Sequence, residues 1–212
     1  MANAPDRRLS EQEYLEIERG LETKNEFYLG KMFAMSGASR KHIVITGNIA
    51  SEIHQQFKDR KCEVYQADMR VKVSPTGLYT YPDVVALCHE PKFEDAAVDT
   101  LLNPQVIIEV ASKSTEQYDR RIKFAHYKTL DSLQVYIMVS QEQPVVERFI
   151  RQPDGQWLLW IGDKLSDELI INCIGCKLRL SDIYARIEFD ELDQFQVREP
   201  YDEKYLASRP SI

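Results

Sequence analysis

The 212-residue chain has the composition of a globular protein, with 43% hydrophobic and 29% charged residues. It contains no apolar stretch long enough to cross a bilayer and no apolar N-terminal segment of the signal-peptide type, so we expect a cytoplasmic protein without membrane attachment. A net charge of -7 argues against indiscriminate binding to nucleic acid, because phosphate contacts need lysine and arginine.

The first half of the chain predicts a helix, a strand hairpin, a long helix and three short strands. Ser10 is placed to cap a helix over residues 9–20. Gly30 lies in the middle of the strand-like segment 25–35, where it indicates a turn or bulge and therefore a hairpin. Isoleucines recur at helical spacing over residues 39–57. Strands are then expected at 63–66, 69–73 and 83–88.

The second half predicts a polar connection over 89–103, a strand that contains Glu109, and a helix over about 115–129. Ser114 and Gln117 fit a capping box at the start of that helix. Further strands are expected at 134–139, 145–150, 157–161 and 169–171, with a short helix at 181–184. This order is typical of the α/β or α+β class, a mixed β-sheet flanked by helices. We expect one domain over residues 1–190 and a polar C-terminal tail over 191–212.

Four cysteines in a cytoplasmic chain are most simply free thiols. Cys173 and Cys176 have the spacing of half a zinc site, but Cys62 and Cys88 are single and widely separated. Both members of the spaced pair lie among apolar residues, where a small buried side chain fits. We therefore assign no metal to the cysteines.

Two carboxylates inside apolar segments are the most informative feature. Asp83 follows Pro82 and opens the run Val84-Val85-Ala86-Leu87, and Glu109 interrupts the run Val106-Ile107-Ile108-Glu109-Val110-Ala111. A carboxylate in an apolar strand is costly unless a partner offsets its desolvation. The 26 residues between the two allow their strands to lie side by side. A shared hard divalent cation, Mg²⁺ or Mn²⁺, is the partner that this pattern favours.

Three segments follow the pattern of a known group: Pro82-Asp83, the segment from Ile107 to Thr115, and the segment from Tyr118 to Tyr127. Through these segments the chain resembles the putative restriction endonuclease family within the PD-(D/E)XK nuclease superfamily. The segments 25–31, 35–39 and 178–184 and His42 extend it over residues 10–188. The resemblance implies a restriction-endonuclease-like fold and a Mg²⁺-dependent DNA endonuclease, in which Asp83 and Glu109 bind the metal.

The chain departs from the superfamily pattern at one position. The lysine expected two residues after Glu109 is replaced by Ala111. The resemblance implies that the lysine has moved into the following helix, which makes Lys123 the catalytic lysine. Helical spacing favours this independently, because Thr115, Asp119, Lys123 and Tyr127 lie four residues apart and form one polar row. Lys113, directly after the strand, is the competing candidate.

Other residues complete the expected site. Glu26 is an auxiliary carboxylate, and His42 is placed to hydrogen-bond near the site or to line a path for DNA. The basic groups expected to hold DNA phosphates without reading the sequence are Arg40, Lys41, Arg120 and Arg121. The strand around Trp157 presents an edge that suits core packing or a homodimer.

Structural interpretations remain open beside the functional one. Asp83 can cap a turn, Glu109 can form an ion pair with Lys123 or Arg120, and Lys123 can pair with Asp119 on an exposed helix face. The alternative function is a catalytically inactive member of the same fold that binds nucleic acid or a protein. A third hypothesis is a purely structural oligomer built on the Trp157 strand.

Overall fold

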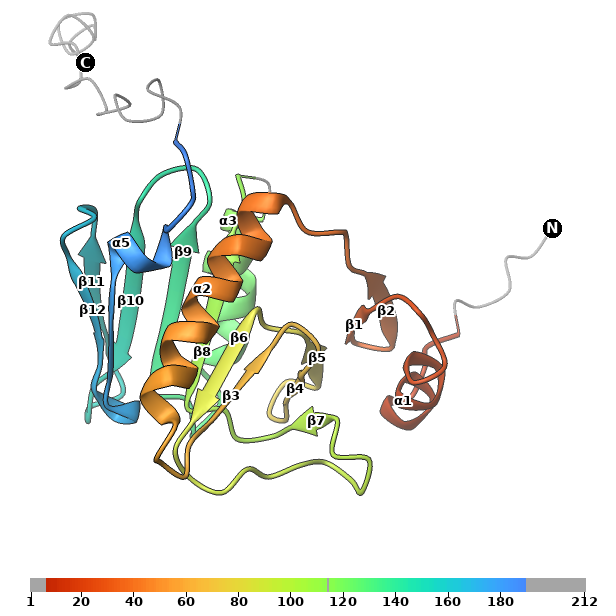
Figure 1. Ribbon diagram of the computed structural model, residues 1–212. Coiled ribbons are helices and arrows are strands. Elements are labelled where there is room, and N and C mark those ends of the chain that lie inside the picture. The colour runs from red at the N-terminus through yellow and green to blue at the C-terminus, as the bar shows by residue number, and fades with distance from the viewer. Residues whose placement is uncertain (1–6, 114, 190–212) are drawn as a thin grey trace, which may run out of the picture.

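The computed structural model describes residues 7–113 and 115–189 and contains three β-sheets with helices on both sides (Figure 1). The helices are α1 (Glu11–Glu18), α2 (Arg40–Phe57), α3 (Glu116–Tyr118), the π-helix η1 (Asp119–Lys123), α4 (Phe124–Tyr127), the 3-10 helix η2 (Asn172–Ile174) and α5 (Leu180–Ile183). The strands of the first half are β1 (Asn25–Tyr28), β2 (Lys31–Ala34), β3 (Glu63–Gln66), β4 (Arg70–Val73), β5 (Leu78–Thr80), β6 (Val84–Leu87) and β7 (Thr100–Leu101). The later strands are β8 (Val106–Ala111), β9 (Val135–Ser140), β10 (Val146–Arg151), β11 (Trp157–Gly162), β12 (Glu168–Ile171) and β13 (Cys176–Arg179).

The central sheet has six strands in the order β11-β10-β9-β8-β6-β3. Within it β8 and β9 are parallel, and the other neighbours are antiparallel. A second sheet has the order β2-β1-β5-β4-β7, and β12 pairs with β13. The architecture is therefore a mixed sheet flanked by helices, as the sequence predicted.

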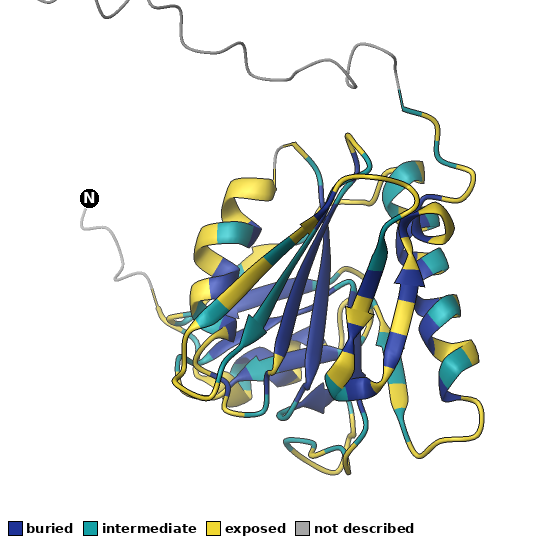
Figure 2. Ribbon diagram, turned by 90° about the vertical axis from the view of Figure 1, so that its left-hand side faces the viewer, coloured by how far each residue is buried: buried dark blue, intermediate teal, exposed yellow. Residues whose placement is uncertain are grey.

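Strand β8 is buried along its whole length, because both faces of the central sheet are covered where β8 lies (Figure 2). Val106, Ile108 and Val110 pack in the core that also holds the buried side of α2. Ile107 and Ala111 alternate onto the opposite face, with Phe124 of α4. Glu109 belongs to this second face by the same alternation, so its carboxylate lies on the side of η1 and α4.

Local signals explain where several elements begin. The Ser10 side chain accepts a hydrogen bond from the Glu13 backbone in the predicted N-terminal helix, and the Glu13 carboxylate completes a capping box. Ser39 caps α2 through the His42 backbone N–H. The predicted hairpin turns at Leu29 and Gly30, both with positive φ. A Cβ on Gly30 would lie 2.5 Å from the Arg8 side chain, so only glycine fits there.

The structure differs from the prediction in three elements that sequence periodicity missed. Strands β5, β7 and β13 are short, and β7 lies within the connection predicted to be simply polar. It pairs in parallel with β4. The helix predicted over 115–129 is interrupted by the five-residue π-helix η1. Ser114, the residue expected to cap it, lies outside the described residues.

The expectation of four free thiols is wrong, because Cys62 and Cys88 form a disulfide. The register of β3 and β6 pairs Glu63 with Leu87, so the two cysteines are the next opposed pair, with Cα atoms 4.1 Å apart. Because the two cysteines are 26 residues apart in the chain, the sequence did not indicate that they are neighbours. Cys173 and Cys176 are free thiols in an apolar environment, as expected.

No helix of the described residues is long and apolar enough to cross a membrane. The predicted tail, residues 191–212, lies outside the described part of the chain, and the division at residue 190 stays a prediction.

Candidate active site

The register of β6 and β8 brings Asp83 and Glu109 together. Val84 pairs with Ile108 in an antiparallel ladder, so Asp83 and Glu109 are the next opposed positions. The Asp83 backbone N–H lies 3.4 Å from Glu109 Oε2. Like charges directly opposite one another destabilise a sheet, so this pair is unfavourable unless a proton or a cation offsets the repulsion.

Asp83 is held in place by contacts on both sides. Its Oδ2 accepts a hydrogen bond of 2.7 Å from the Val110 backbone N–H. Its Oδ1 lies 2.9 Å from His42 Nε2, which extends from the first turn of α2. Asp83 therefore joins the end of β8 to the helix that covers the opposite face of the sheet, and it does more than cap a turn.

Glu109 is almost fully buried, and its other oxygen faces η1 and α4. Lys123 Nζ lies 3.2 Å from Glu109 Oε1, and the Tyr127 hydroxyl donates a hydrogen bond of 2.8 Å to the same oxygen. The ion pair with Lys123 that the sequence offered as a structural alternative is thus present. It accounts for one oxygen of Glu109 and leaves the Oε2 atom beside Asp83.

Lys123 is surrounded by three carboxylates. In addition to Glu109, Glu26 Oε1 of β1 lies 3.2 Å and Asp119 Oδ1 lies 3.7 Å from its Nζ. Glu26 is itself held by the hydroxyls of Thr80 and Tyr118. The hairpin β1–β2 therefore contributes a carboxylate to a site that is otherwise built on the central sheet.

The π-helix η1 helps to keep Asp119, Lys123 and Tyr127 on one side of the helical segment. In an α-helix of 3.6 residues per turn, side chains four residues apart drift steadily around the axis. A π-turn is wider, with hydrogen bonds to the fifth residue along, and it removes part of this drift. Asp119, Lys123 and Tyr127 are consequently all buried, so Lys123 and Asp119 do not form the exposed pair that was the alternative.

The pKa values follow from burial and from the crowding of carboxylates. Burial raises the pKa of Glu109 to about 8, against the opposing effect of Lys123 and with a further increase from Asp83 and Asp119. Burial alone would lower the pKa of Lys123, but Glu109, Glu26 and Asp119 together raise it well above its ordinary value. Lys123 therefore stays charged, while burial favours the protonated form of Glu109.

These groups lie in a cleft of about 740 Å³ between the β1–β2 hairpin, the segment 35–39, α2 and the ends of β6 and β8. Its charged side chains, apart from His42, are Glu26, Asp83, Glu109, Asp119, Lys24 and Lys123. Carboxylates thus outnumber lysines by two. Because phosphate is anionic, a cation would have to enter before a phosphodiester could approach these carboxylates closely.

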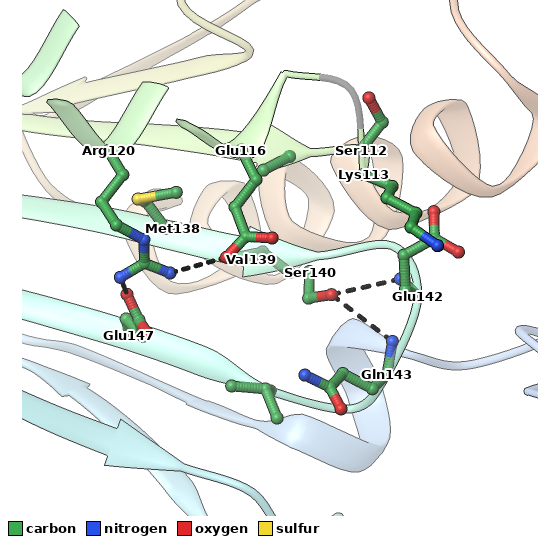
Figure 3. A pocket seen from close by; sticks show the side chains of 12 residues that line it. Ser112, Lys113, Glu116, Arg120, Met138, Val139, Ser140, Glu142, Gln143 and Glu147 are labelled. Carbon is green, nitrogen blue, oxygen red and sulfur yellow. Dashed lines mark hydrogen bonds and ion pairs between the residues drawn. The ribbon is translucent and has the colours of Figure 1, made fainter. Parts of the chain in front are cut away.

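The structure separates Lys113 from this cleft. Lys113 lines a second cavity, of about 70 Å³, on the other side of the end of β8 (Figure 3). Arg120 lines the same small cavity, where it pairs with Glu116 at 2.9 Å and with Glu147. Of the two candidate lysines, only Lys123 lies beside Glu109.

The remaining predicted basic residues do not line the cleft. Arg40 is exposed at the start of α2, and Lys41 lies with its Nζ 5.6 Å from the centre of the Phe189 ring. Arg121 is exposed on η1. The roles assigned to these residues and to the clustered Asp83, Glu109, Lys123, Glu26 and His42 stay predictions.

Two contributors were missed by sequence reasoning. Tyr127 belonged to the recognised four-residue spacing, which is the signal that could have identified it as a partner of Glu109. Gln141 follows β9, the parallel neighbour of β8, and its Nε2 donates a hydrogen bond of 3.1 Å to the Val110 carbonyl. Only the pairing of β8 with β9 reveals that Gln141 ends beside the site.

The donor set fits a hard cation that keeps much of its water. Among the described residues no group of three or more His, Cys, Asp or Glu side chains is arranged to hold a metal ion. Asp83 and Glu109 nevertheless present adjacent carboxylates. Burial raises the pKa of Glu109 by penalising its charged form, and a bound cation would reduce that penalty. Mg²⁺ is commonly bound by one or two carboxylates together with water.

Comparisons with known proteins agree with this architecture. The chain is 35% identical to "Uncharacterized protein sll1609" of Synechocystis sp. over 75% of this chain and 90% of that protein. It is 32% identical to "Uncharacterized protein slr1290" of the same organism over 88% of this chain and 97% of the relative. The structure is similar to the crystal structure of a putative nuclease belonging to DUF820 from Anabaena variabilis, with a TM-score of 0.67 and 19% identity over 82% of this chain and 96% of that one.

The structural similarity confirms the predicted restriction-endonuclease-like fold. A family model described as "Uma2: Putative restriction endonuclease" matches residues 11–181, which is most of the chain. This chain therefore belongs to the Uma2 family of putative restriction endonucleases.

Proposed function

We propose that this protein is a Mg²⁺- or Mn²⁺-dependent endonuclease that hydrolyses phosphodiester bonds in DNA. One observation carries the proposal: Asp83 and Glu109 are opposed at the end of a buried ladder, with Lys123 Nζ 3.2 Å from the second of them. Membership of a family described as putative restriction endonucleases agrees with this chemistry.

Asp83 and Glu109 would hold the metal, with the Val110 backbone carbonyl as a third oxygen. A divalent cation at this position would polarise the scissile phosphate and lower the pKa of an attacking water. A hydrogen bond from the Val110 backbone N–H and the contact with His42 Nε2 orient the Asp83 carboxylate. The Tyr127 hydroxyl does the same for Glu109.

Lys123 would act as a charged donor. Because its pKa is raised well above the ordinary value, it cannot accept a proton near neutral pH. It would instead orient water or stabilise the negative charge that develops on the phosphate. Glu26 of β1 and Asp119 of the same π-helix position the ammonium group. Arg40, Lys41, Arg120 and Arg121 are the proposed contacts to more distant phosphates.

The test is nicking of supercoiled plasmid by the full chain with Mg²⁺ or Mn²⁺. Asp83→Asn keeps the size of the side chain but removes its charge, and we expect it to abolish nicking. Glu142→Gln, at an exposed carboxylate of the small cavity, is the matched control and should nick normally. Metal-dependent nicking that survives in Asp83→Asn and in Glu109→Ala would overturn the proposal.

A catalytically inactive binding protein is the second candidate, and the closed pairing of Lys123 with Glu26 and Glu109 favours it. In that case the carboxylates are satisfied by the lysine and need no metal. Such a protein would bind DNA or a partner with no change in melting temperature on addition of Mn²⁺.

We also propose that the protein forms a homodimer. Strand β11 is an edge of the central sheet, and its Leu158 and Ile161 are 58% and 51% exposed. An exposed apolar edge strand invites pairing with another strand. Light scattering on the native chain and on Ile161→Lys would test this, because the charge should dissociate a dimer formed at this edge.

A further inference from the structure

Two walls of the large cleft, the β1–β2 hairpin and α2, each carry an exposed apolar side chain. Phe33 of β2 and Ile43 of α2 both line this cleft and are 50% and 60% exposed. Neither side chain belongs to the buried apolar cores of the described residues. The two walls are joined by the segment 35–39, which runs from the end of β2 to the start of α2 (Figure 1).

Both side chains share the cleft with the charged cluster. Phe33 is the direct register partner of Glu26, so both side chains are on the same face of the β1–β2 hairpin. Ile43 of α2 lines the same cleft as His42 and Asp83. A group held between Phe33 and Ile43 would therefore lie in the cleft that contains the position proposed for the scissile phosphate.

Gly47 adds an independent observation. It lies one turn after Ile43 on α2, it is exposed, and it lines the same cleft. A Cβ at this position would meet nothing within 4 Å, so no neighbouring residue requires glycine there. Glycine in the middle of a helix destabilises it relative to alanine. Gly47 therefore lowers the stability of α2, and its missing side chain leaves space at the wall of the cleft.

We infer that this cleft binds an unstacked nucleobase between Phe33 and Ile43, with Gly47 leaving room for it. The inference rests on the proposed function and specifies its substrate as single-stranded DNA or a strand with an extruded base. In a paired duplex the base faces are stacked on one another, and apolar protein side chains reach few base atoms. A free base offers a face that packs on an aromatic ring irrespective of its identity.

The charge of the cleft favours this class of substrate over an intact duplex. The two lysines that line it are both paired, Lys24 with Asp68 at 2.9 Å and Lys123 with Glu109 and Glu26. Few phosphates can be neutralised here, so base packing has to supply much of the affinity. The dependence of binding on salt should accordingly be shallow, because its slope follows the number of phosphates contacted.

The experiment measures binding of the full chain to one fluorescently labelled oligonucleotide, presented single-stranded and as a duplex, with Ca²⁺ in place of Mg²⁺. We expect tighter binding to the single strand. Phe33→Ala should weaken single-strand binding about 10-fold or more, since one base–aromatic contact has about that value. Phe33→Trp should retain it. Leu159→Ala, at an exposed apolar residue of β11 outside the cleft, should leave it unchanged.

Gly47→Leu separates binding from folding. Leucine is a better helix former than glycine, so the melting temperature should stay equal or rise, while single-strand binding should be lost because the space is filled. Equal affinities of the native chain, Phe33→Ala and Gly47→Leu for the single strand would overturn the inference, as would a clear preference for the duplex. Either result could coexist with metal-dependent nicking that Asp83→Asn abolishes, and the proposed function would then stand alone. Absence of nicking and of binding to both oligonucleotides would overturn the two together.

Discussion

The large cleft around Glu109 and the small cavity around Lys113 both border the end of β8, but they hold their charges in different environments. In the cleft the side chains of Lys123 and Glu109 are 8% and 4% exposed. In the small cavity the Arg120 and Glu116 side chains are 36% and 53% exposed. Exposed ion pairs contribute about 0–1 kcal/mol, whereas buried charges carry a desolvation cost that pairing only partly offsets. The cleft retains an arrangement that stability alone does not favour, which is typical of a functional site.

The largest expected effect is on stability. Lys123→Met removes the ammonium group from three buried carboxylates, and we expect a loss of about 3–5 kcal/mol in the free energy of unfolding. Lys113→Met, at the exposed lysine of the small cavity, should change it by less than about 0.5 kcal/mol. Urea unfolding of the two variants beside the native chain measures both. Similar small losses of unfolding free energy in Lys123→Met and Lys113→Met would mean that the buried ion pairs of Lys123 contribute no more to stability than an exposed lysine does.

The second effect is a pH dependence that belongs to the cleft. Burial raises the pKa of Glu109 to about 8 in the folded chain, from an ordinary value near 4.5. Between these values the folded state binds a proton that the unfolded state has released, so stability falls as the pH rises from about 5 to 8, by on the order of a few kcal/mol. Glu109→Gln should flatten this profile in metal-free buffer. A native profile that rises over the same interval would contradict the cause assigned to the pKa.

Metal binding should distinguish the two cavities next. A cation present at about 100 times its Kd stabilises a folded protein by about 2.7 kcal/mol. We expect Mn²⁺ to raise the melting temperature of the native chain and of Glu142→Gln, but not of Asp83→Asn. Calorimetric melts with and without Mn²⁺ provide the measurement. An equal rise in the melting temperatures of Glu142→Gln and Asp83→Asn on addition of Mn²⁺ would locate the metal outside the cleft.

The smallest effect concerns two tyrosine hydroxyls. Tyr127 donates to the Glu109 carboxylate in the cleft, whereas Tyr184 donates at 2.8 Å to the carbonyl of Val145, which lines the small cavity. Hydrogen bonds to charged groups contribute about 1.5–3 kcal/mol and neutral ones about 1 kcal/mol. Tyr127→Phe should therefore destabilise the chain more than Tyr184→Phe in denaturant unfolding at pH 9, where Glu109 is largely ionised. The reverse order would argue against a charged acceptor at Tyr127.

Much of the fold followed from local pattern. The Ser10 cap, the turn at Gly30 and the isoleucine stripe of α2 depend on neighbours within four residues, and each was predicted. The Ser39 cap of α2 is equally local but was not predicted. Strands β5 and β7 have three and two residues and were missed, because so short a segment carries no measurable periodicity. Strand β13, with four residues, was missed as well. The π-helix was missed because its extra residue per turn leaves no mark in composition.

By itself the sequence determined that two carboxylates interrupt apolar strands, and that Asp119, Lys123 and Tyr127 form a row on one helical segment. Tertiary structure alone decided that Asp83 opposes Glu109, that Cys62 bonds to Cys88, and that Lys123 faces the cleft while Lys113 lines another cavity. The physical reason is one of range. Periodicity reflects contacts two to four residues apart, whereas strand register is set by burying both faces of the central sheet at once, over separations of 26 residues at the disulfide.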